Sequence, residues 1–82
     1  MVYNRHLMIM SSFRIIPKRR LREANGSRYL EVYQDVYVTP NGNASHPWNS
    51  RTMRDIQDAI EEKYGLKITH INESFFDFEK LD

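Results

Sequence analysis

Residues 46–65 have the sequence His46-Pro-Trp-Asn-Ser-Arg-Thr-Met-Arg-Asp-Ile-Gln-Asp-Ala-Ile-Glu-Glu-Lys-Tyr-Gly65, and this stretch decides the fold. Its apolar side chains recur at three- and four-residue spacing, which places them on one stripe of an α-helix. Because charged residues fill the positions off the stripe, the pattern predicts an amphipathic helix whose apolar side must be covered by the rest of the chain. The stripe consists of Met53, Ile56, Ala59, Ile60 and Tyr64.

Both ends of this helix are marked in the sequence. Gly65 can adopt the left-handed backbone conformation that commonly ends helices, so the helix is predicted to stop there. At the start, the side-chain oxygen of Asn49 can accept a hydrogen bond from an unpaired amide of the first turn. Thr52, followed by Asp55, offers a competing start three residues later.

A long strand is predicted at residues 28–39, which are rich in β-branched and aromatic side chains. Alternate residues of a strand point to opposite faces, so the even and odd positions form two separate sets. From residue 30 to residue 38 the even set is aliphatic apart from Gln34, matches the helix stripe in chemistry, and is expected to pack on it. Its apolar members are Leu30, Val32, Val36 and Val38.

Shorter strands are predicted on either side of these two elements. Residues 13–16 form one, which Pro17 ends because proline has no amide hydrogen for the ladder. Strand patterns also occur after the helix, at residues 66–71 and 75–78. The order β-β-α-β predicts an α+β fold, in which a three- to four-stranded, mainly antiparallel sheet packs against one amphipathic helix.

The chain of 82 residues is expected to form a single domain over residues 1–82, with a small core. Residues 1–12 are expected to be a flexible segment or to add one strand at about 3–10, and residues 79–82 a frayed tail. The chain has no cysteine, which excludes disulfides, thiolate metal sites and cysteine catalysis. Its longest apolar run, residues 7–10, is too short to span a membrane, so we expect a soluble, cytoplasmic protein with no membrane partner.

Charge is distributed unevenly along the chain, although the net charge is only +1. Residues 1–28 hold seven cations and one carboxylate, a net charge of +6, whereas residues 29–82 hold five cations and ten carboxylates, a net charge of −5. The two halves attract each other. The basic half could therefore fold onto the acidic half of the same chain, or it could meet an acidic partner.

The densest group of cations comprises Lys18, Arg19, Arg20 and Arg22, which precede the turn signal Asn25-Gly26-Ser27. We call residues 18–22 the basic arm. Each of its cations could neutralise a phosphate, so one hypothesis is nucleic-acid binding through the basic arm. The alternative is a solvated hairpin arm, because basic runs are also common on ordinary protein surfaces.

The odd positions of the long strand carry Tyr29, Tyr33 and Tyr37, spaced four residues apart with Glu31 and Asp35 between them. Three rings on one strand face could stack on bases, but interspersed carboxylates would repel a phosphate backbone. Tyrosine beside acidic groups suits a protein surface that carries arginine or lysine. The alternative is that a second layer of the same chain covers these rings.

No catalytic residues are predicted. The three histidines lack partners at a recognised metal-ligand spacing, so neither a metal site nor a cofactor is expected, and no small-molecule substrate is indicated. We therefore expect a non-enzymatic protein-interaction or regulatory module that uses the tyrosine face and the basic arm. Such a module could act as a homodimer. The alternative is a nucleic-acid-binding protein that contacts phosphates through residues 18–22.

Overall fold

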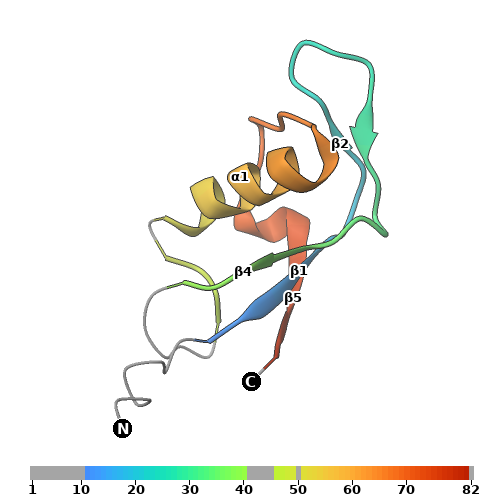
Figure 1. The fold of residues 1–82 in the computed structure, drawn as a ribbon. Coiled ribbons are helices and arrows are strands. Elements are labelled where there is room, and N and C mark those ends of the chain that lie inside the picture. The colour runs from blue at the N-terminus through green and yellow to red at the C-terminus, as the bar shows by residue number, and fades with distance from the viewer. Residues whose placement is uncertain (1–10, 41–45, 50, 82) are drawn as a thin grey trace, which may run out of the picture.

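A computed structural model of the chain describes residues 11–40, 46–49 and 51–81. The predicted strand at residues 3–10 lies outside this part of the chain. The main sheet has three strands. Figure 1 shows helix α1 lying over one side of this sheet, while a short hairpin extends beyond its end. In chain order, the elements are β1 (Phe13–Pro17), β2 (Leu21–Arg22), β3 (Tyr29–Leu30), β4 (Val36–Val38), α1 (Thr52–Tyr64), the 3₁₀ helix η2 (Glu73–Phe75) and β5 (Phe76–Lys80).

Strand β1 is the centre of the main sheet, whose strand order is β4-β1-β5 with both pairs antiparallel. Phe13, Ile15 and Pro17 alternate with less buried residues, so one face of β1 points into the core. The opposite face brings Arg14 beside Tyr37 of β4 and Glu79 of β5. The sheet therefore has an apolar face toward the helix and a polar face away from it.

The amphipathic helix is confirmed, with its apolar stripe on the core side. Ile56 and Ile60 have no exposed surface, and Met53, Ala59 and Tyr64 pack against the same core. Burying one such isoleucine side chain stabilises a fold by roughly 1.5–3 kcal/mol. The stripe is thus the main contribution of the helix to stability.

The stop at Gly65 is also confirmed, since it adopts the left-handed conformation with φ 71° and its amide donates to the Glu61 carbonyl. The helix begins at Thr52, the later of the two predicted starts, so the prediction that Asn49 caps the first turn is wrong. The Asn49 side chain instead accepts from the amide of Arg51, one residue before the helix, at 2.8 Å. It closes a turn that leads into the helix.

The prediction of one continuous strand over residues 28–39 is wrong, because the segment is divided between two sheets. Residues 29–30 pair with β2, residues 36–38 pair with β1, and a turn at Val32 and Tyr33 separates them. Two hydrogen bonds close this turn, from the Gln34 amide to the Glu31 carbonyl at 3.0 Å and from the Glu31 amide to the Gln34 side chain at 2.7 Å. The Glu31 amide thus bonds to a glutamine side chain instead of to a neighbouring strand, and strand pairing is interrupted here.

Two predictions for the C-terminal third need correction. Leu66 and Ile68 are buried and alternate with exposed residues as predicted, but residues 66–71 form no strand. The sequence predicts a frayed tail at residues 79–82, yet Glu79 and Lys80 pair with β1, and the Leu81 amide donates to the Ser12 carbonyl, while residue 82 lies outside the described residues. The predicted fold class is nevertheless confirmed, because a mainly antiparallel sheet packs against one helix.

Candidate binding site: the arginine-aromatic groove

The basic arm forms a two-stranded hairpin. In it Leu21 pairs with Leu30, and Arg22 pairs with Tyr29. Since both leucines are buried, strand alternation turns Arg22 and Tyr29 to the opposite, exposed side. The hairpin turn includes Asn25 with φ 57°, a left-handed conformation that asparagine tolerates better than most residues. The turn signal in the sequence therefore correctly located the hairpin.

One groove of about 370 Å³ lies beside this hairpin, and we call it the arginine-aromatic groove. Its walls come from the basic arm, from β3 and from the segment that enters β5. It brings together four of the seven residues that the sequence suggested for binding and adds three others. The lining residues are Arg19, Arg20, Leu21, Arg22, Tyr29, His70 and Phe75.

Two of its guanidinium groups lie against aromatic rings. The central guanidinium carbon of Arg20 is 4.1 Å from the ring centre of Tyr29, and that of Arg19 is 5.1 Å from the ring centre of Phe75. The His70 ring adds a third plane, with its centre 6.2 Å from that of Phe75. Cation–π contact orients a guanidinium and leaves its N–H groups available for hydrogen bonds.

The cations of the arm differ in how far they are neutralised. Arg20 pairs with Glu31 at 3.0 Å, and Lys18, which is not part of the groove lining, pairs with Asp77 at 3.7 Å. Among the described residues, Arg19 and Arg22 have no carboxylate within ion-pair distance. The Arg22 side chain donates a hydrogen bond to the Gly26 carbonyl, at 3.2 Å. The groove therefore keeps two uncompensated positive charges at an exposed surface.

Two lining residues, His70 and Phe75, were missed in the sequence, where they lie about 50 residues from the arginines. The backbone explains their position. The Lys18 amide donates to the Phe75 carbonyl at 2.8 Å, directly after Pro17 pairs with Phe76. This contact between distant segments has no local sequence signal, whereas the arginines and Tyr29 stood out by composition alone.

The three tyrosines do not form one platform, because the strand that would have aligned them is interrupted. Tyr29 belongs to the groove, Tyr33 is on the turn with 78% of its surface exposed, and Tyr37 is on the polar face of β4. The ammonium group of Lys63 lies 5.6 Å from the ring centre of Tyr37. The three tyrosines are exposed, but on separate parts of the surface.

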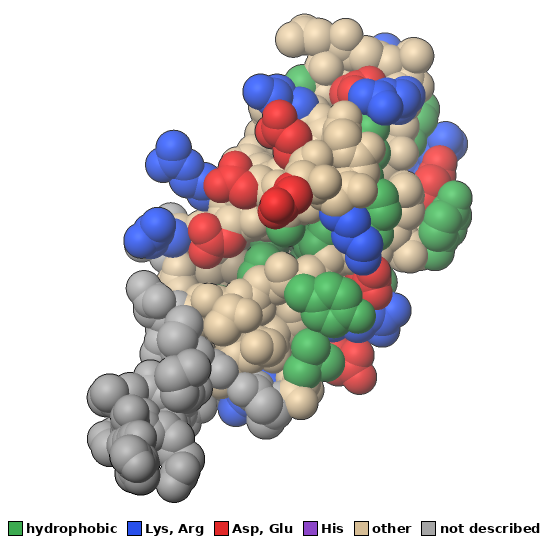
Figure 2. Space-filling view, viewed as in Figure 1, with side chains coloured by type: hydrophobic (Ala, Val, Ile, Leu, Met, Phe, Trp, Pro, Cys, Tyr) green, Lys and Arg blue, Asp and Glu red, His purple; other side chains and the backbone are tan. Residues whose placement is uncertain are grey.

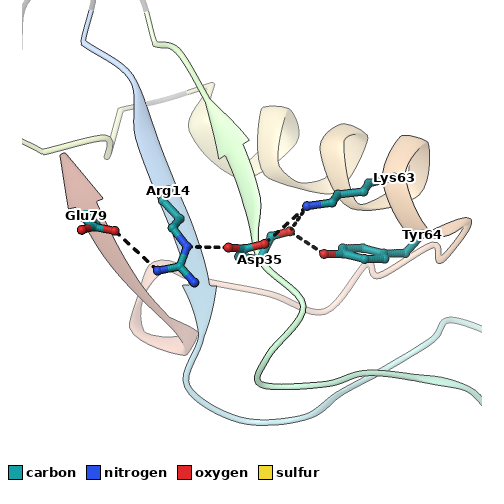
Figure 3. Close-up of polar contacts among 5 residues, drawn as sticks. All are labelled: Arg14, Asp35, Lys63, Tyr64 and Glu79. Carbon is teal, nitrogen blue, oxygen red and sulfur yellow. Dashed lines mark hydrogen bonds and ion pairs between the residues drawn. The ribbon is translucent and has the colours of Figure 1, made fainter. Parts of the chain in front are cut away.

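A second polar cluster lies around Asp35, where Figure 3 shows contacts from β1, β5 and the end of α1. The Asp35 carboxylate accepts hydrogen bonds from Arg14 and Lys63, and the Tyr64 hydroxyl donates to the Asp35 carbonyl at 2.6 Å. The Arg14 hydrogen bond is the main reason that the pKa of Asp35 lies below its usual value. This cluster holds the helix end to the sheet.

The uneven charge of the chain is compensated in part by ion pairs among the described residues. Arg14, Lys18 and Arg20 from the basic half each pair with a carboxylate from the acidic half. Figure 2 accordingly shows positive and negative side chains interspersed over the visible face. The intramolecular alternative therefore holds for these three cations, and Arg19 and Arg22 are the arm residues that remain for a partner.

Across residues 11–40, 46–49 and 51–81, no group of three or more His, Asp or Glu side chains is placed to hold a metal ion. In the same residues, no helix has the length and apolar content needed to cross a bilayer. Comparisons with protein-family models, with curated proteins and with solved structures found no match. A function for this chain must therefore be argued from the groove itself.

Proposed function

We propose that this chain is a non-enzymatic binding module that receives an anionic partner in the arginine-aromatic groove. The observation that carries the proposal is the presence of three guanidinium groups in one groove, two of which have no carboxylate partner in the part of the chain that the structure describes. Guanidinium groups bind carboxylates and phosphates through paired N–H donors, and at an exposed surface they also attract such groups over a distance. The proposal also includes the prediction that this protein is located in the cytoplasm.

The lining of the groove supports binding rather than catalysis. Among the described residues, no serine, threonine or carboxylate lines the groove to act as a nucleophile or base beside His70. Arginine remains protonated and serves to bind charge rather than to act as a base. The groove therefore offers recognition of charge and of flat surfaces.

The proposal is tested by the salt concentration at which the protein elutes from a heparin column. The double variant Arg19→Ala, Arg22→Ala should elute at clearly lower salt than the unaltered chain, because it lacks both uncompensated groove charges. The matched control is Arg54→Ala, Lys80→Ala, which removes two exposed charges from α1 and β5. If both variants lose retention equally, net charge alone governs binding and the proposal fails.

A second function, self-association or binding of another protein, is favoured by a different observation. Val32 and Tyr33 are adjacent on the turn between β3 and β4, with 45% and 78% of their surfaces exposed. An exposed tyrosine next to an aliphatic side chain is typical of the centre of protein interfaces. Under this proposal the turn contacts a second copy or another protein, and the groove charges add long-range attraction to its acidic surface.

A further inference from the structure

The flat surfaces in the groove narrow the choice of anionic partner. Arg20 lies over Tyr29 and Arg19 over Phe75, so the walls present guanidinium groups against aromatic rings rather than isolated charges. Planar arginine and aromatic side chains are the groups on which unpaired bases stack in proteins that bind single strands. A peptide of acidic residues would use the N–H groups of the arginines but has no aromatic ring to stack on these surfaces.

The ion pairing of the arginines also favours a partner that carries both unpaired bases and phosphates. Arg20 is already paired with Glu31 at 3.0 Å, which weakens it as a phosphate ligand but leaves its flat face able to stack. Arg19 and Arg22, which have no ion pair among the described residues, are free to contact phosphates. The groove thus combines a stacking pair, Arg20 with Tyr29, and two cations that can contact the phosphates of a nucleic-acid backbone.

We infer that the arginine-aromatic groove binds a single-stranded segment of nucleic acid, with a base stacked at Arg20 and Tyr29 and phosphates at Arg19 and Arg22. This inference rests on the proposed function, because it names the partner of the same groove. A duplex is disfavoured, since its bases are stacked on one another and present only their edges in the grooves.

The test is fluorescence anisotropy with a labelled 12-nucleotide single strand of mixed sequence. Three other labelled probes, matched to the single strand in length or charge, are titrated in separate experiments. They are the duplex of the same sequence, an abasic deoxyribose-phosphate oligomer, and a polyglutamate peptide. The single strand should bind at least about fivefold more tightly than the abasic oligomer, because stacking contributes about 1–3 kcal/mol per base. The duplex should bind more weakly than the single strand.

Salt dependence tests the phosphate contacts separately. Each phosphate neutralised on a single strand contributes about −0.7 to the slope of log Kobs against log salt, so two contacts predict a slope of about −1.4. Arg19→Ala should reduce the size of this slope by about 0.7. Tyr29→Leu should lower the affinity about fivefold to tenfold with the slope unchanged, because it removes stacking without removing charge.

Arg20→Lys separates stacking from charge, because it keeps the positive charge and loses the planar guanidinium. It should weaken binding of the single strand severalfold and leave binding of the abasic oligomer unchanged. Tyr37→Leu, an exposed tyrosine outside the groove, and Arg54→Lys on the helix are the matched controls and should bind like the unaltered chain. Circular dichroism of each variant verifies that the fold is retained.

The outcomes distinguish this inference from the proposed function. If polyglutamate or the abasic oligomer binds as tightly as the single strand, the groove receives anions but the nucleic-acid inference is overturned. The same holds if the duplex binds more tightly, or if Arg20→Lys and Tyr29→Leu leave the affinity unchanged. If none of the four probes binds and heparin retention is the same in both double variants, the inference and the proposed function fail together.

Discussion

Truncating Leu30 and Val32 in turn tests whether the segment after the hairpin is broken as the structure shows. The two residues lie two positions apart, so a continuous strand would place both on one buried face. In the structure Leu30 has no exposed surface, whereas Val32 is 45% exposed on the turn. The two substitutions should therefore have very different effects on the free energy of unfolding.

The expected magnitudes follow from the burial of each side chain. Leu30→Ala removes a fully buried side chain and should lower the free energy of unfolding by about 2–5 kcal/mol. A domain of 82 residues is expected to have a total of roughly 4–12 kcal/mol, so this loss is a large fraction of it. Val32→Ala at the exposed turn should change it by less than about 0.5 kcal/mol.

Urea denaturation followed by circular dichroism measures both effects. With a slope near 1 kcal/mol per molar urea, Leu30→Ala should move the midpoint down by about 2 M or more, while Val32→Ala should move it by less than about 0.5 M. In a continuous strand Val32→Ala would lose at least about 1.6 kcal/mol, because two buried carbon groups are removed. Comparable losses in the two variants would therefore refute the interrupted strand.

Three further predictions concern the Asp35 cluster, the helix stop and the exposed turn. Because Arg14 holds the pKa of Asp35 below its usual value near 3.9, the Asp35 carboxylate contributes stability that is fully present above this pH and is lost as the pH falls through its lowered pKa. Asp35→Asn should therefore flatten the acid side of a plot of urea midpoint against pH, and an unchanged acid side would contradict this role. Gly65→Ala should cost about 1–2 kcal/mol in urea denaturation, since φ is 71° and nothing lies near the added methyl group, whereas Gly65→Asn should cost less. Tyr33→Ala should reduce any self-association seen by light scattering without moving the urea midpoint, and unchanged association would count against the second proposed function.

The candidate site was only partly visible in the sequence. The arginines and Tyr29 stood out because clustered charge and regularly spaced rings are local patterns. His70 and Phe75 were not assigned to the site, because their place in the groove depends on the backbone contact between Lys18 and Phe75. The prediction that the three tyrosines share one strand face was wrong for a related reason, since strand alternation places side chains on a shared face only while the strand continues.

Local spacing and the stop signal in the sequence alone determined the helix, its apolar stripe and its end at Gly65, whereas the choice between the two candidate starts was made only in the structure, at Thr52. A helix satisfies most of its backbone hydrogen bonds within itself, so its pattern can be interpreted without knowledge of the rest of the chain. The alternation at residues 66–68 likewise predicted which side chains are buried, although not whether a strand forms there.

Strand pairing was decided by the tertiary structure, because a strand needs a partner from elsewhere in the chain. Strand β1 accepts β4 on one side and β5 on the other, which leaves residues 66–71 outside the main sheet, with a backbone bond from the Ala24 amide to the Lys67 carbonyl. The same competition divides residues 29–38 between β2 and β1. The groove exists because these long-range pairings bring the basic arm beside the segment that enters β5.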